Sequence, residues 1–353
     1  MSTHWKEIEK TAMRRALSLA RRAWGRTNPN PMVGAVILKD GKVVGEGYHR
    51  AAGTHHAEVE ALRAAGEAAR GATAVVNLEP CSTHGRTPPC TDALIRAGIS
   101  RLVYGTEDPS PIHKGKGAAM LQKHGIEVEG GLCREACENL NAAFFCRVQA
   151  GRPLVCLKMA MTLDGKIATA SGASQWVTGE EARGRVQKLR RWADAVMVGG
   201  ETVRIDDPQL TVRQPKGWQP QPRKIIWTRN PDQFNKQFRI WQDSDNPPLF
   251  VTLSGRQEWL EWLKKLAAEK DVSALLIEGG GQLAGTVIAA GIVDQIKFFI
   301  APKILGGARS RPVTGGPNPE SLTEATMVKD RRMERIGDDY LLTGYLSDVH
   351  RID

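Results

Sequence analysis

One histidine, two cysteines and one glutamate in the first quarter of the sequence have the types and the order of a zinc enzyme's active site. His56 precedes Glu58 by two residues, and Cys81 and Cys90 follow. An imidazole and two thiolates supply three zinc ligands, which leaves the fourth tetrahedral position open for water. A free carboxylate beside them can move protons. The set predicts a zinc-dependent hydrolytic deaminase, with His56, Cys81 and Cys90 as ligands and Glu58 as the proton carrier.

The spacing of the cysteines leaves an alternative open. Zinc deaminases usually separate their two cysteines by two residues, whereas eight lie between Cys81 and Cys90. A closed structural site with His84 as the fourth ligand is the competing interpretation, but it would leave Glu58 without a role. His49 lies in a glycine-containing stretch just before the motif and is a candidate substrate contact, although a loop histidine is more often ordinary surface.

The zinc motif needs helices and strands that bring its parts together. Two residues along a helix turn by about 200°, so His56 and Glu58 must lie in the first turn of a helix over 56–65. A strand over 74–78 would carry Cys81 at its end, and Pro88-Pro89 would start a second helix at Cys90. Both helix N-termini then favour anionic thiolates.

The rest of the first half predicts an α/β sheet. An opening helix buries a stripe of residues at helical spacing: Trp5, Ile8, Ala12, Ala16 and Ala20. Asp40-Gly41 predicts a hairpin between two strands, and glycines 45, 47 and 53 could bring backbone close to a ligand. A further strand, helix and strand follow between 101 and 129, and one closing helix is expected over 134–149.

Gly151-Arg152-Pro153 interrupts the helical pattern and is the best candidate for a domain boundary. Strands are expected after it at 154–161, 195–198, 223–228, 249–253, 274–278 and 295–301. Helices are expected at 257–268, at 282–290 and from Thr178, which has capping-box spacing with Glu181, to Trp192. Alternating strands and helices predict a second α/β domain.

Two features of the second half could do chemistry. Glycines 279–281 follow an apolar strand and open a helix, so backbone N–H groups there could hold a phosphate, although such turns are frequent without one. Asp206 and Asp207 are either a carboxylate pair for acid–base or metal chemistry, or a capped turn with ordinary charges.

Length and composition limit the class of protein. At 353 residues the chain exceeds the size at which one core keeps growing, so two domains are expected. The net charge of +10 is spread evenly, since residues 1–150 hold 20 basic and 15 acidic residues and the remainder 29 and 24. This favours small anionic ligands over nucleic acid. Without a run of about 18 apolar residues or a signal-peptide core, we expect a cytoplasmic protein that does not bind membranes.

Several strings together resemble the family of bifunctional riboflavin biosynthesis proteins over nearly the whole chain. In the first half these are residues 28–34 (NPNPMVG), 55–58 (HHAE), 79–81 (EPC) and 87–90 (TPPC). In the second half they are residues 158–165 (KMAMTLDG), 174–176 (SQW), 206–213 (DDPQLTVR) and 278–280 (EGG). The gap of eight residues between the cysteines is this family's own spacing.

The resemblance implies an α/β fold class in which a cytidine-deaminase-like three-layer domain precedes a dihydrofolate-reductase-like domain. Residues 1–150 would be a zinc-dependent pyrimidine deaminase and 151–353 an NADPH-dependent reductase. The substrate would be 2,5-diamino-6-(5-phosphoribosylamino)pyrimidin-4-one, which is deaminated before its ribosyl group is reduced to ribityl. The implied cofactors are one Zn²⁺ per chain and NADPH, and the implied assembly is a homo-oligomer.

The resemblance also assigns residues in the second half. Those expected against NADP are Ala160, Trp176, Thr202, Asp206, Thr228, Gly280, Gly281, Gln282, Leu283, Ala284, Gly285 and Thr286. Those expected on the substrate side are Ser174, Arg190, Leu210, Arg213 and Glu278, with Lys158 as a further contact. One departure is Thr83, which stands where the family usually has a histidine, so that Thr83 or His84 would have to supply that histidine's substrate contact.

Two other functions remain as alternatives. A nucleic-acid base deaminase would use the same zinc site, but it gives no role to the second half. A non-catalytic, zinc-stabilised RNA-binding protein would show RNA affinity that falls steeply with salt and would need Glu58 only for stability.

Overall fold

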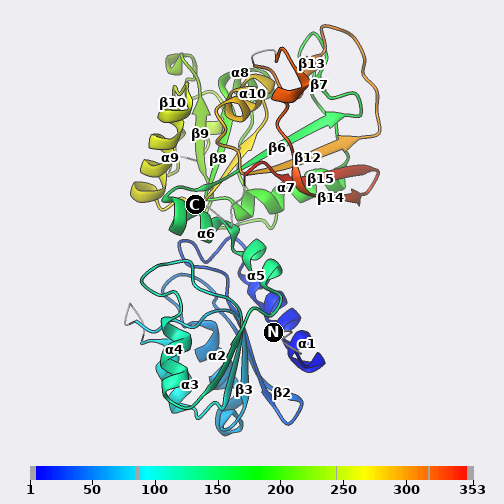
Figure 1. Ribbon diagram of the computed structural model, residues 1–353. Helices are drawn as coiled ribbons and strands as arrows, with labels where there is room; N and C mark the ends of the chain where they lie inside the picture. The colour runs from blue at the N-terminus through cyan, green and yellow to red at the C-terminus, as the bar shows by residue number, and fades with distance from the viewer. Residues whose placement is uncertain (1–4, 84–87, 244, 317–318, 348–353) are drawn as a thin grey trace. The chain divides into compact units, whose positions relative to one another are not determined.

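The computed structural model describes residues 5–83, 88–243, 245–316 and 319–347. The chain divides into two compact units, Met1–Ala150 and Gly151–Asp353, each with its own main sheet (Figure 1). Within the described residues, no helix combines the length and the apolar character needed to cross a membrane.

The first unit is built on a five-stranded sheet with the order β2-β1-β3-β4-β5. β1 is antiparallel to β2 and β3, whereas β3, β4 and β5 are parallel. The strands are β1 (Gly34–Lys39), β2 (Lys42–Tyr48), β3 (Thr73–Leu78), β4 (Arg101–Thr106) and β5 (Glu127–Gly130). The helices are α1 (Glu7–Ala20), α2 (Ala57–Ala65), α3 (Cys90–Arg96), α4 (Lys116–Lys123), α5 (Arg134–Leu140) and α6 (Ala142–Ala150).

Side chains alternate between the two faces of this sheet and form two separate cores. Val36 and Val75 pack with α1 and α5 on one face. Ile37 and Val76 pack with α2, α3 and α4 on the other. The result is the three-layer arrangement of helices on both faces of a sheet.

Glycines 45 and 47 have a different use from the expected one. Both lie in β2, where they face the backbone of α2 rather than a ligand. A Cβ at Gly47 would lie 2.4 Å from the carbonyl oxygen of Ala57, and one at Gly45 would lie 2.3 Å from that of Ala61. These positions let the helix that carries the zinc motif lie directly on the sheet.

Two expected elements of this unit differ from the structure. Ile8 is 37% exposed, and the buried face of α1 is formed instead by residues that include Glu9, Met13 and Leu17. The closing helix is broken into α5 and α6 at Asn141. The buried Asn141 side chain accepts a hydrogen bond from the Met32 amide and donates one to the Met32 carbonyl, a long-range contact that helical periodicity does not reveal.

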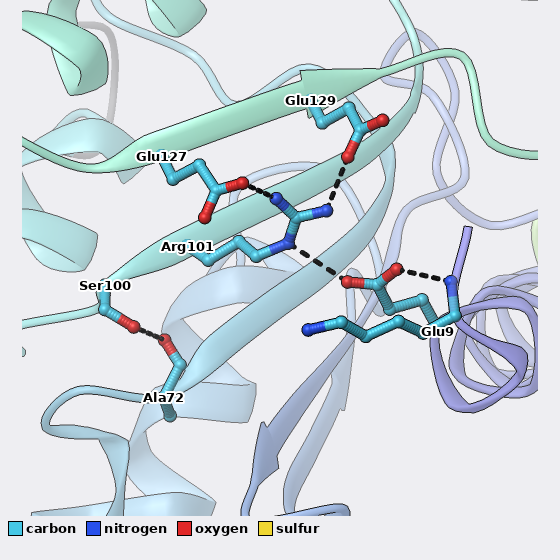
Figure 2. A network of polar contacts seen from close by, with 7 residues as sticks. Glu9, Ala72, Ser100, Arg101, Glu127 and Glu129 are labelled. Atoms are coloured by element: carbon cyan, nitrogen blue, oxygen red, sulfur yellow. Dashed lines mark hydrogen bonds and ion pairs between the residues drawn. The ribbon is translucent and has the colours of Figure 1, made fainter. Parts of the chain in front are cut away.

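A network centred on Arg101 joins three elements of the first unit (Figure 2). Arg101 begins β4, and its guanidinium contacts Glu127 and Glu129 of β5 and donates to Glu9 of α1 at 3.0 Å. Glu9 also accepts from the Lys6 amide at 3.0 Å, which caps α1. Because Arg101 stands at the amino end of β4, this network lies at the opposite end of the parallel strands from Cys81.

We expect Arg101→Met to destabilise the first unit by about 3 kcal/mol, because it leaves the nearly buried Glu9 carboxylate without its counter-charge. The solvent-exposed pair Arg15–Glu46 provides the control, and Arg15→Met should cost no more than about 1 kcal/mol. Denaturant unfolding of the full chain, followed through the transition of the first unit, measures both changes. Equal losses in the two variants would contradict a structural role for the network.

The second unit contains an eight-stranded sheet with the order β10-β9-β8-β11-β6-β12-β15-β14. Neighbouring strands are parallel from β10 to β12, and β12, β15 and β14 are antiparallel. The strands of this sheet are β6 (Leu154–Thr162), β8 (Ala195–Gly199), β9 (Arg223–Trp227), β10 (Leu249–Val251), β11 (Ala274–Glu278), β12 (Gln295–Ala301), β14 (Lys329–Ile336) and β15 (Asp339–Tyr345). A separate pair is formed by β7 (Lys166–Ala168) and β13 (Arg311–Pro312).

The helices of the second unit are α7 (Glu180–Trp192), α8 (Gly200–Asp206), α9 (Arg256–Lys270) and α10 (Gly281–Ala289). The expected capping box at Thr178 is wrong. Gly179 is the N-cap, and its amide donates to the Asp339 carboxylate at 2.7 Å. A residue 160 positions away thus accepts from the N-cap amide, which in the expected capping box is the part of the Glu181 side chain.

Two candidate active sites

The zinc motif comes together at the carboxyl end of β3. His56 is the N-cap of α2, Cys81 follows β3, and Cys90 is the first residue of α3. Their ligand atoms lie within 4.8 Å of one another. The His56 Nδ1 atom is 3.1 Å from the Cys90 Sγ atom and 3.5 Å from that of Cys81. This set of one imidazole and two thiols, gathered at two helix N-termini, fits a zinc ion.

The two cysteines have different electrostatic environments. A hydrogen bond from the Cys90 thiol, with the nearby His56 imidazole, lowers the pKa of Cys81 to about 4. Donating that hydrogen bond, together with burial, holds the pKa of Cys90 well above its ordinary value. The hydrogen bond to Cys81 raises the pKa of His56. The two thiols thus shift in opposite directions, and Cys81 is the one that ionises more readily.

We expect zinc binding to release protons, because the Cys90 thiol must ionise and His56 must be neutral to act as ligands. Zinc affinity should rise by about tenfold per pH unit for each proton released, and should fall as the pH is lowered. Calorimetric titration with zinc in two buffers of different ionisation enthalpy measures the number released. An affinity independent of pH between 6 and 8 would contradict this ligand set.

Glu58 lies in the first turn of α2, two residues after His56, and is 4% exposed. It does not belong to the ligand cluster. Burial raises its pKa above the ordinary value of a glutamate, and the charge of Cys81 adds to that effect. A carboxyl group in this position can accept and return a proton near neutral pH.

Both ring nitrogens of His49 contact neighbouring residues of the chain. The ring also packs edge-on against the His56 ring, with 5.4 Å between the two ring centroids. Its Nδ1 atom lies 3.1 Å from the His55 carbonyl, and its Nε2 atom lies 3.1 Å from the Asn30 amide nitrogen. Burial lowers the pKa of His49. Because a carbonyl oxygen can only accept, Nδ1 carries a proton and donates it to His55. His49 therefore links the Asn30 turn to the zinc motif, whatever contact it makes with substrate.

The residues that follow Cys81 are described only in part. The Thr83 hydroxyl oxygen lies 3.3 Å from the Nδ1 atom of His113. Thr83 stands at the position where the resemblance led us to expect a histidine, so a histidine from another loop lies beside that position. His84 lies outside the described residues, as does the segment 85–87 of the loop between the two cysteines.

Sequence reasoning assigned no role to Glu79, which is buried directly before Pro80 and Cys81. Its carboxylate accepts hydrogen bonds from the amides of Asp108, Gly115 and Ala118 at 3.0–3.3 Å. It thereby ties the loop before α4 to the end of β3. A buried carboxylate between a strand and a zinc ligand is the signal that could have indicated this role.

The second unit contains a cavity of about 680 Å³ at the carboxyl ends of its central strands. Thirteen of the predicted residues line it: Lys158, Ala160, Ser174, Trp176, Arg190, Thr202, Asp206, Leu210, Arg213, Glu278, Gly280, Gly281 and Gln282. The structure thus gathers around one space residues that are up to 124 positions apart in the sequence.

An ion-pair cluster lies in the wall of this cavity. Arg190 donates to both carboxylate oxygens of Glu278, at 2.6 and 3.1 Å, and Lys158 Nζ lies 3.9 Å from Glu278. Burial acts to raise the pKa of Glu278, but Arg190 and Lys158 outweigh it and keep the pKa below its ordinary value. Burial lowers the pKa of Lys158, and Glu278 opposes that effect. The cluster is therefore charged but almost completely removed from water.

Asp206 and Asp207 do not form a carboxylate pair. Asp206 accepts a hydrogen bond from the Ser174 hydroxyl at 2.6 Å inside the cavity. Asp207 accepts one from the backbone amide of Arg239 at 2.7 Å. The two carboxylates thus have different partners, Asp206 inside the cavity and Asp207 on the segment that begins at Arg239.

Five residues expected against NADP do not line the cavity: Thr228, Leu283, Ala284, Gly285 and Thr286. Leu283 and Ala284 belong to the hydrophobic core. Gly285 lies against the backbone of Gly315, where a Cβ would come within 1.9 Å of the carbonyl oxygen. The Thr286 hydroxyl donates to the Gln282 carbonyl within α10. The Thr228 side chain packs against Gly200, the first residue of α8. Only the first turn of the expected loop faces the cavity.

Lys303 is a residue near this cavity that sequence reasoning missed. It follows β12, and its ammonium donates to the carbonyls of Trp176 and Val177 at 3.3 and 3.0 Å. The guanidinium of Arg183 lies 4.6 Å from the centre of the Trp176 ring. Together these contacts hold Trp176, which is 62% exposed, at the cavity wall.

Comparison with known proteins agrees with both sites. The cytidine and deoxycytidylate deaminase zinc-binding region matches residues 6–106, and the RibD C-terminal domain matches residues 153–342. The riboflavin biosynthesis protein RibD of Actinobacillus pleuropneumoniae is 42% identical over 94% of this chain and 93% of that protein. The RibD protein of Escherichia coli strain K12 is 41% identical over 94% and 97%.

Solved structures give the same result for the fold. Acinetobacter baumannii RibD, form 1, superposes with a TM-score of 0.87 at 35% identity and covers 96% of this chain and 99% of its own. A diaminohydroxyphosphoribosylaminopyrimidine deaminase/5-amino-6-(5-phosphoribosylamino)uracil reductase from Thermotoga maritima superposes with a TM-score of 0.85 at 35% identity. By sequence and by fold, the chain belongs to the RibD family of bifunctional riboflavin biosynthesis enzymes.

Proposed function

We propose that the first unit deaminates 2,5-diamino-6-(5-phosphoribosylamino)pyrimidin-4-one and that the second unit reduces the ribosyl group of the resulting 5-amino-6-(5-phosphoribosylamino)uracil to ribityl. The observation that carries the proposal is the presence of a zinc-ligand cluster with a buried glutamate and an arginine-lined cavity in one chain. The family to which the chain belongs supports both activities.

In the first unit His56, Cys81 and Cys90 would hold the metal. When bound, zinc supplies a nucleophilic water at neutral pH. Glu58 takes one proton from the attacking water at its carboxylate and delivers it to the ring nitrogen. It then transfers the second proton, from the hydroxyl group that the water has become, to the leaving amine, so that ammonia departs and a carbonyl group forms. The ring of His49 and the buried Glu79 hold the surrounding loops in place.

In the second unit Ala160, Trp176, Thr202, Asp206 and Gly280–Gln282 would contact NADPH. When bound, NADPH supplies the hydride. The reduction breaks the bond between C1′ and the ring oxygen of the ribosyl group, adds the hydride to C1′ and adds a proton to that oxygen. Lys158, on the cavity wall beside Glu278, is the candidate proton donor. Arg213 would bind the substrate's phosphate, since a guanidinium group can hold it in a bidentate manner. Arg190, whose Nε and Nη2 atoms donate to Glu278, would contribute its remaining N–H groups to the same phosphate.

Two separate activity assays on the zinc-loaded chain test the proposal. The diaminopyrimidinone should release ammonia without NADPH, and the phosphoribosylaminouracil should drive NADPH oxidation. Deamination only of tRNA or single-stranded DNA would establish the nucleic-acid deaminase instead. Absence of both activities, with RNA affinity that falls steeply with salt, would favour the non-catalytic alternative.

We further infer a cytoplasmic location, because Cys81 and Cys90 must stay reduced to bind zinc and cytosolic thiols are kept reduced. The homo-oligomeric state stays a prediction.

A further inference from the structure

Five arginines line the reductase cavity: Arg183, Arg190, Arg213, Arg239 and Arg311. Arg311 pairs with Glu201, and Arg183 lies over the Trp176 ring. Arg190 is neutralised by its two hydrogen bonds to Glu278. Among the described residues, Arg213 and Arg239 form no ion pair with an aspartate or a glutamate. Neither sequence patterns nor the family resemblance assigned Arg239 a role. Arg213 and Arg239 therefore each lack an ion-pair partner among the described residues, although the Asp206 carboxylate, which accepts from Ser174, brings one negative charge to the same cavity.

Two hydrogen bonds fix the backbone at Arg239, one to its own amide and one to the carbonyl of the next residue. The Arg239 amide donates to the Asp207 carboxylate at 2.7 Å. The carbonyl of the next residue, Ile240, accepts a hydrogen bond from the ammonium of Lys224 at 2.7 Å. Lys224 is 1% exposed, and burial of such a cation is costly unless it has a partner. Two charged side chains are thus used to hold residues 239 and 240.

A second contact joins the same two segments. The Gln209 side chain donates to that of Gln242 at 2.6 Å, so the chain after α8 and the 3-10 helix Arg239–Trp241 are held together at two points. Asp207 has a positive φ of 41°, a backbone conformation that non-glycine residues seldom adopt. The turn at Asp207 places its carboxylate toward Arg239 and leads directly into Leu210 and Arg213, which line the cavity.

We infer that Arg239 is a third phosphate-binding arginine of the reductase site, held in place by Asp207, and that it acts with Arg190 and Arg213 on the 5′-phosphate of the substrate. The inference rests on the proposed function. A phosphate dianion would accept charge-assisted hydrogen bonds from the two unpaired guanidinium groups, and Arg190 would add only the N–H groups that do not donate to Glu278 or Thr211. Burial lowers the pKa of Arg213, and the charges of Arg190 and Arg239 lower it further, as expected for cations that face a common space.

Steady-state kinetics with two substrates tests the inference. Arg239→Gln should raise KM for 5-amino-6-(5-phosphoribosylamino)uracil by about tenfold, the value of one charge-assisted hydrogen bond. It should leave kcat within about twofold, and KM for the dephosphorylated riboside unchanged. Arg239→Lys should recover part of the loss. Lys236→Gln is the control, because it removes one positive charge from the same segment outside the cavity.

Asp207 is tested as a positioning residue in the same assay. Asp207→Ala should raise KM only for the phosphorylated substrate, and Asp207→Asn, which keeps an acceptor for the Arg239 amide, should recover most of it. Thermal unfolding identifies any variant that has lost its fold.

The outcomes separate the inference from the proposed function. If the wild-type chain does not oxidise NADPH with the phosphoribosylaminouracil, the proposed function fails. If the wild type is active, the inference is overturned by an Arg239→Gln variant with unchanged KM, by equal losses on both substrates, or by a rise in KM for NADPH alone.

Discussion

Glu58→Gln is expected to reduce deamination by about 10²- to 10⁴-fold while the protein still binds one zinc ion. Glutamine has nearly the same shape as glutamate but cannot take a proton from water and return it to the substrate. Zinc should be retained because Glu58 is outside the ligand cluster of His56, Cys81 and Cys90. Ammonia release from the diaminopyrimidinone measures the activity, and elemental analysis measures the metal.

The second unit provides the internal control for this variant. NADPH oxidation with the phosphoribosylaminouracil should be unchanged in Glu58→Gln, since Glu58 belongs to the unit Met1–Ala150 and the reductase cavity lies in the unit Gly151–Asp353. Deamination at the wild-type rate would refute the assignment of Glu58. Loss of zinc would show instead that Glu58 helps to hold the ligands.

Glu278→Gln is expected to have the largest effect in the second unit. It leaves Arg190 and Lys158, which are 12% and 14% exposed, without the carboxylate that balances both. Removal of one partner from a buried ion pair costs about 3–5 kcal/mol. Without Glu278 the burial of Lys158 is unopposed by a carboxylate, so the pKa of Lys158 should fall further. Misplacement of Arg190 should also lower reductase activity by about 10²-fold.

Calorimetric unfolding and NADPH oxidation measure the two effects of Glu278→Gln. Glu334→Gln is the matched control, because Glu334 forms an exposed ion pair with Arg185 and should change stability by no more than about 1 kcal/mol. Deamination should be unaffected in both variants. A Glu278→Gln protein as stable as Glu334→Gln would show that the buried cluster does not stabilise the fold.

The zinc site could be predicted from the sequence because its chemistry is local. His56 and Glu58 lie in one helical turn, and Cys81 and Cys90 follow elements whose patterns are clear. The central strands of both sheets are mostly apolar runs between turn residues, so their existence could be predicted as well. The resemblance to a known family added the substrate and the reductase residues, which the patterns of the second half do not reveal.

The parts that escaped prediction depend on contacts between distant residues. Asn141 breaks a helix to bind Met32, and Gly179 begins a helix against Asp339. β14 and β15 form a hairpin at the edge of the second sheet. β14 consists largely of polar and charged residues, so its sequence lacks the apolar pattern that indicates a strand. Arg239 joins the cavity only because Asp207 and Lys224 hold its segment there.

The close packing of α2 on β2 has a consequence for how the sequence can vary. A methyl group at Gly45 or Gly47 would collide with the backbone of α2 and displace the turn that holds His56 and Glu58. A survey of all single substitutions scored by deaminase activity would therefore mark both glycines as intolerant as the zinc ligands. Neither glycine touches zinc or substrate in the proposed mechanism. An active site defined by mutational sensitivity alone would therefore wrongly include both of them.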